Sequence, residues 1–194
     1  MIIGGGGGFQ GLLHHGIARL NANGTLDTSF DPQTIIYGAG VRSFVVQSDG
    51  KMLVAGVAGD GTNYGFVRLN ADGSLDTGFH PDLRAVIQYE DCGDPNCSCY
   101  QYAMPVAVVV QADGKVLIGG QTVTLTECPD GSGDIIYRPF VARFNADGSL
   151  DGSFLMVIGN RDSGVNALAV QPDGKVLVGG SFFFSINGTN RYGI

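Results

Sequence analysis

The segment Val165-Asn-Ala-Leu-Ala-Val-Gln-Pro-Asp-Gly-Lys-Val-Leu-Val-Gly-Gly180 decides the fold. Two apolar runs joined by a tight Asp-Gly turn are typical of a β-hairpin, because glycine accepts the positive φ that such turns require. The turn signature Gln-x-Asp-Gly-Lys occurs three times, at residues 47–51, 111–115 and 171–175. Its aspartates, Asp49, Asp113 and Asp173, are 64 and 60 residues apart. A period of this length predicts a propeller, a solenoid or another repeat array.

A second signature, Asn-Ala-Asp/Asn-Gly-Ser/Thr-Leu-Asp-x-x-Phe, alternates with the first and occupies residues 21–30, 70–79 and 145–154. Each period therefore contains two tight turns and four expected strands. Strand A comprises 41–47, 105–111 and 165–171, strand B 175–180, strand C 66–70 and 141–145, and strand D 75–79. No segment has convincing helical periodicity. We therefore expect an all-β fold, a β-propeller-like array of four-stranded antiparallel blades with about three repeats per chain.

The repeat phase also predicts which side chains neighbouring blades share. Large apolar residues at one phase of a repeat are expected at the contacts between repeats. We expect these buried positions to be taken by Phe30, Phe79 and Phe154, with Leu26, Leu75 and Leu150 beside them. Strand A is expected to be innermost, because its small residues suit the crowded region near the axis: Ser43, Ala107, Ala167 and Ala169.

The segment 165–180 and the string Ile17-Ala-Arg-Leu-Asn-Ala-Asn-Gly-Thr-Leu-Asp-Thr-Ser-Phe30 closely resemble the delta-60 repeat family. The resemblance covers nearly the whole chain outside two insertions. It implies a β-propeller-like fold of the kind found in tandem in large, often secreted, bacterial proteins. The family has no established catalytic residues, so the resemblance assigns none to this chain.

We expect a single repeat domain over 1–194, with 17–79, 80–154 and 155–194 plus 1–16 as its repeat units. The insertions are expected at about 80–104 and 121–138. The expected strand order is B-C-D, A-B-C-D, A-B-C-D, A-B, and three blades cannot close a ring. Two partners remain open: self-association through the open blade edges, by which two copies would make six blades, or further repeats of a longer chain.

All four cysteines lie in the two insertions, which share one face of the expected fold: Cys92, Cys97, Cys99 and Cys128. We expect two disulfides that stiffen this face. Because Cys97 and Cys99 are too close for an unstrained bond, each should pair elsewhere, so one bridge should join the two insertions. The spacing also permits a four-thiolate zinc site at the same cysteines, although it lacks paired Cys-x-x-Cys motifs. Free thiols are the third possibility.

Other polar residues are candidate ligands or catalysts, but their patterns are weak. His14, His15 and His80 are expected in solvated loops. The stretch 70–76 has oxygens at alternating positions, like a calcium loop, but lacks a distal glutamate, so we expect a hairpin turn. A glycosidase would need two paired carboxylates, and nothing selects two from the acidic residues of the insertion face: Asp60, Glu90, Asp91, Asp94, Glu127, Asp130 and Asp134.

Composition narrows the function. The net charge is −7 with only 11 Lys and Arg, which argues against a nucleic-acid partner. No apolar run is long enough to span a bilayer, and 1–8 lacks the features of a signal peptide, so either the chain is cytosolic or its signal lies outside this sequence. We expect an extracellular or cell-surface location. The predicted function is a non-enzymatic scaffold or recognition module, without cofactor or metal, that binds protein or glycan through the insertion-loop face. The alternative is a glycoside hydrolase-like enzyme using loop carboxylates.

Overall fold

The computed structural model describes residues 2–4, 16–32, 40–56, 65–87, 95–157, 162–181, 183–186 and 189–192. The described chain is built of antiparallel strands and one short 3-10 helix, η2 (Leu83–Val86). The strands are β1 (Ile2–Gly4), β2 (Ile17–Arg19), β3 (Val41–Val46), β4 (Met52–Gly56), β5 (Phe66–Leu69), β6 (Ser98–Val110), β7 (Val116–Glu127), β8 (Ile135–Phe144), β9 (Leu150–Val157), β10 (Val165–Val170), β11 (Val176–Gly180), β12 (Phe183–Ile186) and β13 (Thr189–Tyr192). No helix in these ranges is long and apolar enough to cross a membrane.

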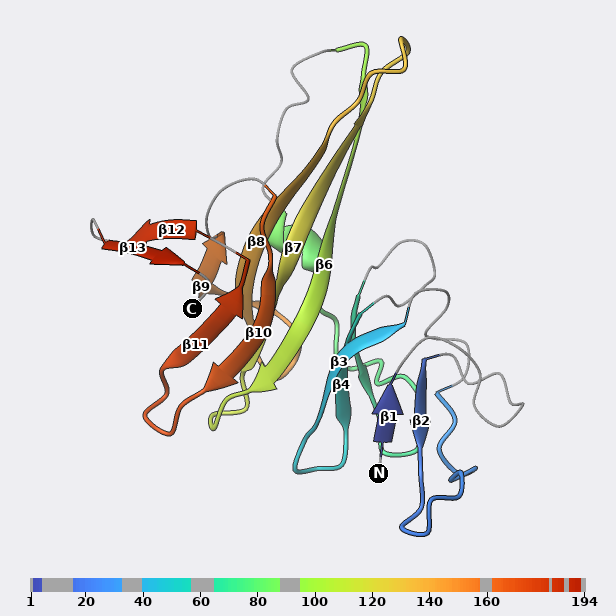
Figure 1. Cartoon of the computed structure of the whole chain (residues 1–194). Coiled ribbons are helices and arrows are strands. Elements are labelled where there is room, and N and C mark those ends of the chain that lie inside the picture. Colours follow the sequence, from blue (N-terminus) through green and yellow to red (C-terminus); the bar gives the residue numbers. More distant parts are fainter. Residues whose placement is uncertain are drawn as a thin grey trace.

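The sheets follow the repeats, and each meanders in chain order. The first unit is β1–β2, the second β3–β4–β5, the third β6–β7–β8–β9 and the fourth β10–β11, while β12 and β13 form a separate hairpin. The predicted all-β, propeller-like architecture is confirmed, and strands A, B and C lie where the two turn signatures placed them. Figure 1 shows the units side by side in chain order, from β1 and β2 (blue) to β10 and β11 (red).

The prediction of a full strand D is wrong for the first two units. There the strand is reduced to single bridges, between Leu20 and Leu26 and between Leu69 and Leu75. The chain then leaves its own sheet because its backbone bonds to the next unit: the N–H of His80 donates to the carbonyl of Asp147, at 3.3 Å. Among the described strands, a complete fourth strand, β9, occurs in the third unit alone, which is the one four-stranded blade seen there.

The A strands of consecutive units are neighbours, as expected for the innermost strands of adjoining blades. β6 contacts β3 on one side and β10 on the other. The hydroxyl of Ser43 in β3 accepts a hydrogen bond from the N–H of Val108 in β6, at 3.3 Å. The small residues were predicted correctly only in part: Ala107 is buried, but Ala167 and Ala169 of β10 are exposed.

Each hydrophobic core lies between two consecutive units. The core between the second and third units surrounds Phe79, and that between the first and second surrounds Phe30. Phe154 packs at the equivalent place between the third and fourth units but is only partly buried. The phenylalanine prediction is thus confirmed for Phe30 and Phe79 and only in part for Phe154. Of the leucines, Leu26 and Leu150 are partly buried, whereas Leu75 is exposed, contrary to expectation.

The insertions form strands where we expected loops. The outer parts of β6, β7 and β8 remain paired far beyond the blade. The outermost pair of β6 and β7 is Ser98 opposite Glu127, and that of β7 and β8 is Leu125 opposite Ile135. In Figure 1 they project as a long arm from the body of the molecule. We call residues 95–104 and 121–139 the arm. The remaining predicted insertion residues include η2, whose Val86 is buried in the core around Phe79.

Candidate functional site

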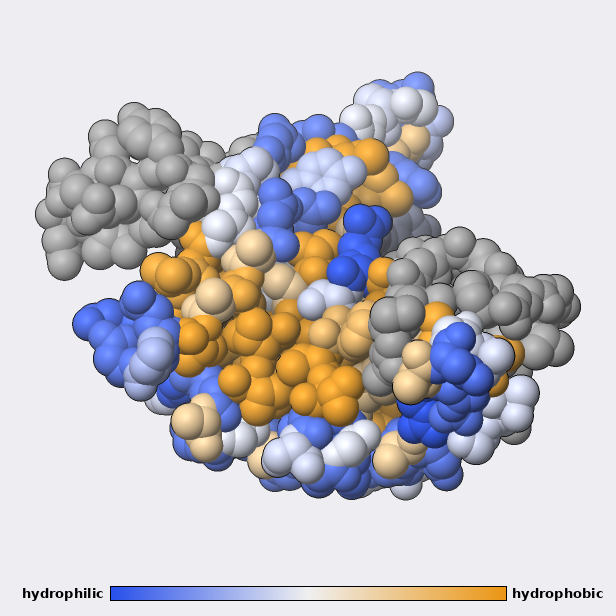
Figure 2. Space-filling view, turned by 60° about the horizontal axis from the view of Figure 1, so that its bottom comes forward, coloured by the Kyte–Doolittle hydropathy of each residue, from blue (hydrophilic) through white to orange (hydrophobic). Residues whose placement is uncertain are grey.

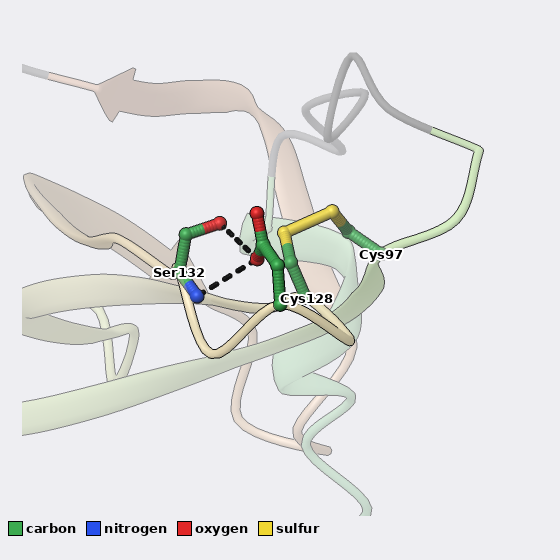
Figure 3. Close-up of a disulfide and its surroundings, with 4 residues drawn as sticks. Cys97, Cys128 and Ser132 are labelled. Carbon is green, nitrogen blue, oxygen red and sulfur yellow. Dashed lines mark hydrogen bonds between the residues drawn. A yellow bond between two sulfur atoms is a disulfide. The ribbon is translucent and has the colours of Figure 1, made fainter.

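The arm is closed by a disulfide between Cys97 and Cys128, which are 31 residues apart in the chain. Cys97 precedes β6 and Cys128 follows β7, so the bridge joins the two insertions, as predicted (Figure 3). Cys99 is also disulfide-bonded, and Cys92 lies outside the described residues. The bridge takes up two of the four thiolates that the zinc alternative requires, so the structure favours the disulfide alternative.

The tip of the arm reuses the turn of the repeats. In Cys128-Pro-Asp-Gly-Ser132, the N–H of Cys128 donates to the carbonyl of Ser132 at 2.9 Å. The Asp130 carboxylate accepts from the backbone N–H and the hydroxyl of Ser132, at 2.9 and 2.6 Å (Figure 3). The turn at 145–149 has the same three bonds. The arm therefore ends in a rigid, pre-formed turn, a feature that the Asp-Gly pattern at 130–131 could have predicted.

The arm carries exposed apolar and aromatic side chains near its bridged end. Tyr100 in β6 is 52% exposed and Ile135 in β8 is 47% exposed. Nearer the body, Thr122 and Val123 of β7 are buried, so the arm is shielded toward its base and exposed at its outer end. An exposed tyrosine on a stiff strand offers a contact area that costs little conformational entropy on binding.

The predicted carboxylates do not form a described acid–base pair. Glu127, Asp130 and Asp134 are exposed on the arm. Asp130 is used by the tip turn, and its hydrogen bonds from Ser132 lower the pKa of its carboxyl group. A glycosidase acid needs a raised pKa, and every shift resolved among the described carboxyl groups is downward. Outside the described residues lie Asp60, Glu90, Asp91, Asp94, His14 and His15, while His80 is exposed.

The calcium-like stretch 70–76 is a turn whose oxygens already have partners. Asp72 accepts from the N–H and the hydroxyl of Ser74, at 2.9 and 2.7 Å. Asp76 accepts from Lys51 and Arg68, both at 2.7 Å. The hydrogen bond from Lys51 is the main cause that lowers the pKa of Asp76 to about 2. The same triad recurs in the third unit, where Asp151 accepts from Lys115 and Arg143.

The arginines of these triads also join consecutive units. Nη1 of Arg19 donates to the carbonyl of Ala71 at 2.6 Å, and Nη1 of Arg68 donates to the carbonyl of Ala146 at 2.7 Å. Arg68 also stacks on Phe79, 4.5 Å from the ring centroid. We call the contact between consecutive units the joint. One unit contributes its arginine, its signature phenylalanine and the residue after that phenylalanine, and the next unit contributes its Asn-Ala-Asp-Gly turn.

Glycine is required in the joint because the two backbones nearly touch. A Cβ added at Gly148 would lie 2.8 Å from the nitrogen of His80, and one at Gly73 would lie 2.8 Å from the backbone of Asp31. Sequence reasoning missed the arginines, although Arg-x-Asn recurs before each of these turns, at Arg19, Arg68 and Arg143. The repeated signatures thus serve mainly to fit one repeat to the next.

Comparison with known families agrees with this description. No curated protein and no solved structure matches the chain. A family model described as "Domain of unknown function (DUF5122) beta-propeller" matches residues 1–30, 47–79, 111–154 and 171–194. Apart from residues 1 and 194, each match begins at the glutamine of a Gln-x-Asp-Gly-Lys turn and ends at the phenylalanine of the second signature. The chain therefore belongs to this β-propeller family.

Proposed function

We propose that the chain is a non-enzymatic scaffold or recognition module that binds a protein or a glycan through its arm. The observation that carries the proposal is the disulfide-bridged arm itself, which extends beyond the blade and exposes Tyr100 and Ile135. The signature residues of the repeats are occupied in joints and turns. In repeat proteins of this kind, binding residues are commonly found on insertions that a rigid array holds in place.

The disulfide supports a location in an oxidising compartment, and we propose the cell exterior or cell surface. We also propose that the repeats are of the delta-60 type, which their two turn signatures resemble and which occurs in large, often secreted, bacterial proteins. In this setting a covalent bridge also stabilises the arm. In the chain-entropy model, closing a loop of 31 residues contributes roughly 3–4 kcal/mol.

The test is a binding screen of the labelled chain on a glycan microarray and on a panel of purified extracellular proteins. The arm variant is Tyr100→Ser with Ile135→Ser. The matched control is Val46→Ser, which alters a side chain that is 50% exposed on a blade strand. We expect affinity for the ligand to fall at least about tenfold in the arm variant and to be unchanged in the control. Equal affinity of the arm variant and the wild type would refute the proposal, and hydrolysis of a bound glycan would favour the hydrolase alternative.

A further inference from the structure

The described chain contains two complete joints. It also contains one arginine side and one Asn-Ala-Asp/Asn-Gly turn of the same kind that are not joined to each other. The first and second units, and the second and third, are fitted together by Arg19 and Arg68. The third unit offers the arginine half again, and the first unit offers the turn half again, but neither is used within the described residues. The two halves are complementary, because they are the parts that fit each other twice within the chain.

The arginine half is free at Arg143. Its Nε donates to Asp151 and its Nη2 donates to Ser153, so these two nitrogens have acceptors within the third unit. In the described part of the chain its Nη1 has no acceptor, whereas Nη1 of Arg19 and of Arg68 each has an alanine carbonyl. Arg143 also stacks on Phe154, 4.7 Å from the ring centroid, as Arg68 does on Phe79. A further turn of the Asn-Ala-Asp-Gly kind would complete this joint.

The turn half is free at Asn21-Ala-Asn-Gly24. This turn has the same bonds as its two counterparts, including donation from the N–H of Asn21 to the carbonyl of Thr25 at 2.8 Å. A Cβ added at Gly24 would meet nothing within 4 Å, whereas one at Gly73 or Gly148 would collide with the preceding unit. The space in front of Gly24 is therefore open.

In the described part of the chain, one edge of β11 has no partner strand. The equivalent strands β4 and β7 are paired on both edges, whereas β11 pairs there with β10 alone. Because that edge of β11 is uncovered, Leu177 of β11 is 46% exposed, whereas its counterparts Leu53 and Leu117 are fully buried. Figure 2 shows apolar side chains gathered on one face of the molecule.

The charges are complementary as well. In the second and third units a lysine binds the strand-D aspartate, as Lys51 binds Asp76. Within the described residues, Lys175 of the fourth unit bonds to Asp173 of its own turn and to no aspartate at the position of Asp76, and its side chain is 75% exposed. Asp27 of the first unit binds Arg19 and, within the described residues, no lysine. Lys175 and Asp27 are therefore the missing partners of one triad.

We propose that residues 17–30 of a second copy of this chain complete the fourth unit. β2 of that copy pairs with β11, Asp27 binds Lys175, and the carbonyl of Ala22 accepts from Arg143. The β11 strand of the first copy therefore replaces the second copy's own β1 as the partner of the second copy's β2. The repeat phase permits this exchange. In the first unit Ile2 of β1 lies opposite Arg19, and in the second unit Leu53 of β4 lies opposite Arg68 in the same way. Leu177 of β11 has the repeat position of Leu53, so β11 can pair with β2 in the same register. The longer strand, of five residues against three, adds pairs.

The contact is head-to-tail and uses different surfaces on the two copies. Two copies can each complete the other, which closes a ring of six blades, a number common among propellers. This inference does not depend on what the arm binds, because none of the residues involved lies on the arm.

The experiment is sedimentation velocity and native mass spectrometry on the chain and two interface variants. Leu177→Asp spoils the β11 half, and Gly24→Asn spoils the turn half, because asparagine tolerates positive φ but brings a Cβ. The controls are Val46→Asp, at a similarly exposed residue, and Gly114→Asn, at a glycine with φ 82° and nothing within 4 Å. We expect the wild type and the controls to be dimers, and the dissociation constant of each interface variant to rise at least about tenfold.

Mixing the two interface variants tests the head-to-tail arrangement. Each supplies the half that the other lacks, so the mixture has one intact contact and we expect dimers to return. Circular dichroism of each variant alone checks that it is folded. A wild-type monomer at all concentrations, or interface variants that dimerise as well as their controls, would overturn the proposal. Failure of the mixture to restore dimers would overturn it too.

Discussion

The joint between the second and third units and the arm of the third unit are stabilised in opposite ways. In the joint, Phe79 is buried in a core shared by two units, and Arg68 and Asp76 are both largely shielded from solvent. At the outer end of the arm, Tyr100 and Ile135 are exposed and a disulfide takes the place of an apolar core. The comparison teaches that residues conserved from repeat to repeat within this chain fit the repeats together. The arm, which has no counterpart in the other described units, exposes its side chains instead.

The largest effect is expected from Phe79→Ala. Truncation of this buried ring should lower the free energy of unfolding by about 3–5 kcal/mol, because it empties the core between two units. Phe154→Ala is the matched variant at the partly buried equivalent and should cost clearly less. Urea unfolding followed by circular dichroism measures both. Equal losses would show that the surroundings of Phe79 and Phe154 do not differ as described.

The disulfide variant Cys97→Ser with Cys128→Ser should act on the arm. We expect the free energy of unfolding to fall by roughly 2–4 kcal/mol, because the unfolded chain regains the freedom of a closed loop. Amide exchange should accelerate in 98–104 and 121–127 and stay unchanged in β3, β4 and β5. Faster exchange throughout the blades would contradict the view that the bridge serves the arm alone.

The next comparison is Arg68→Ala with Arg143→Ala. Both variants lose an ion pair to an aspartate and a stacked phenylalanine, but only Arg68 donates to the following unit. Arg143 donates instead to Ser153 of its own turn, at 3.2 Å, where the second unit has Gly78. Because the bond from Arg68 is shorter, 2.7 Å, and joins two units, Arg68→Ala should be the more destabilising, by less than about 1 kcal/mol, the typical value of one net hydrogen bond. Thermal unfolding of dilute, monomeric samples measures the difference. The idea fails if Arg143→Ala is equally or more destabilising.

The smallest effect is a dependence of stability on acid. The pKa of Asp76 is lowered to about 2 by Lys51, so its contribution is present above the ordinary aspartate pKa near 4 and is lost as pH falls toward 2. Lys115 holds the pKa of Asp151 below its usual range in the same way. Asp76→Asn should flatten the fall in urea midpoint between pH 4 and pH 2. An unchanged slope would show that Asp76 contributes nothing to it.

Sequence reasoning succeeded where a pattern was repeated and local. The positions of strands A, B and C follow from two turn signatures, and the burial of Phe30 and Phe79 follows from their shared phase. Strand D was predicted wrongly in the first two units because there, as after Leu75, the chain bonds to another unit, a contact between residues far apart in sequence. The arm was predicted as loops because the insertions occur once each. Their strands depend on mutual pairing, which a repeat pattern cannot reveal.

The central claim is that the repeat signatures fit each unit to the next, and Gly148→Asn tests it most directly against Gly114→Asn. The two glycines have φ of 92° and 82° in Asp-Gly turns, but only Gly148 lies against the preceding unit, with the nitrogen of His80 2.8 Å from an added Cβ. The melting temperature of each variant is the measurement. We predict a marked fall for Gly148→Asn and little change for Gly114→Asn. Equal changes would contradict the claim that the signature turn is part of a joint.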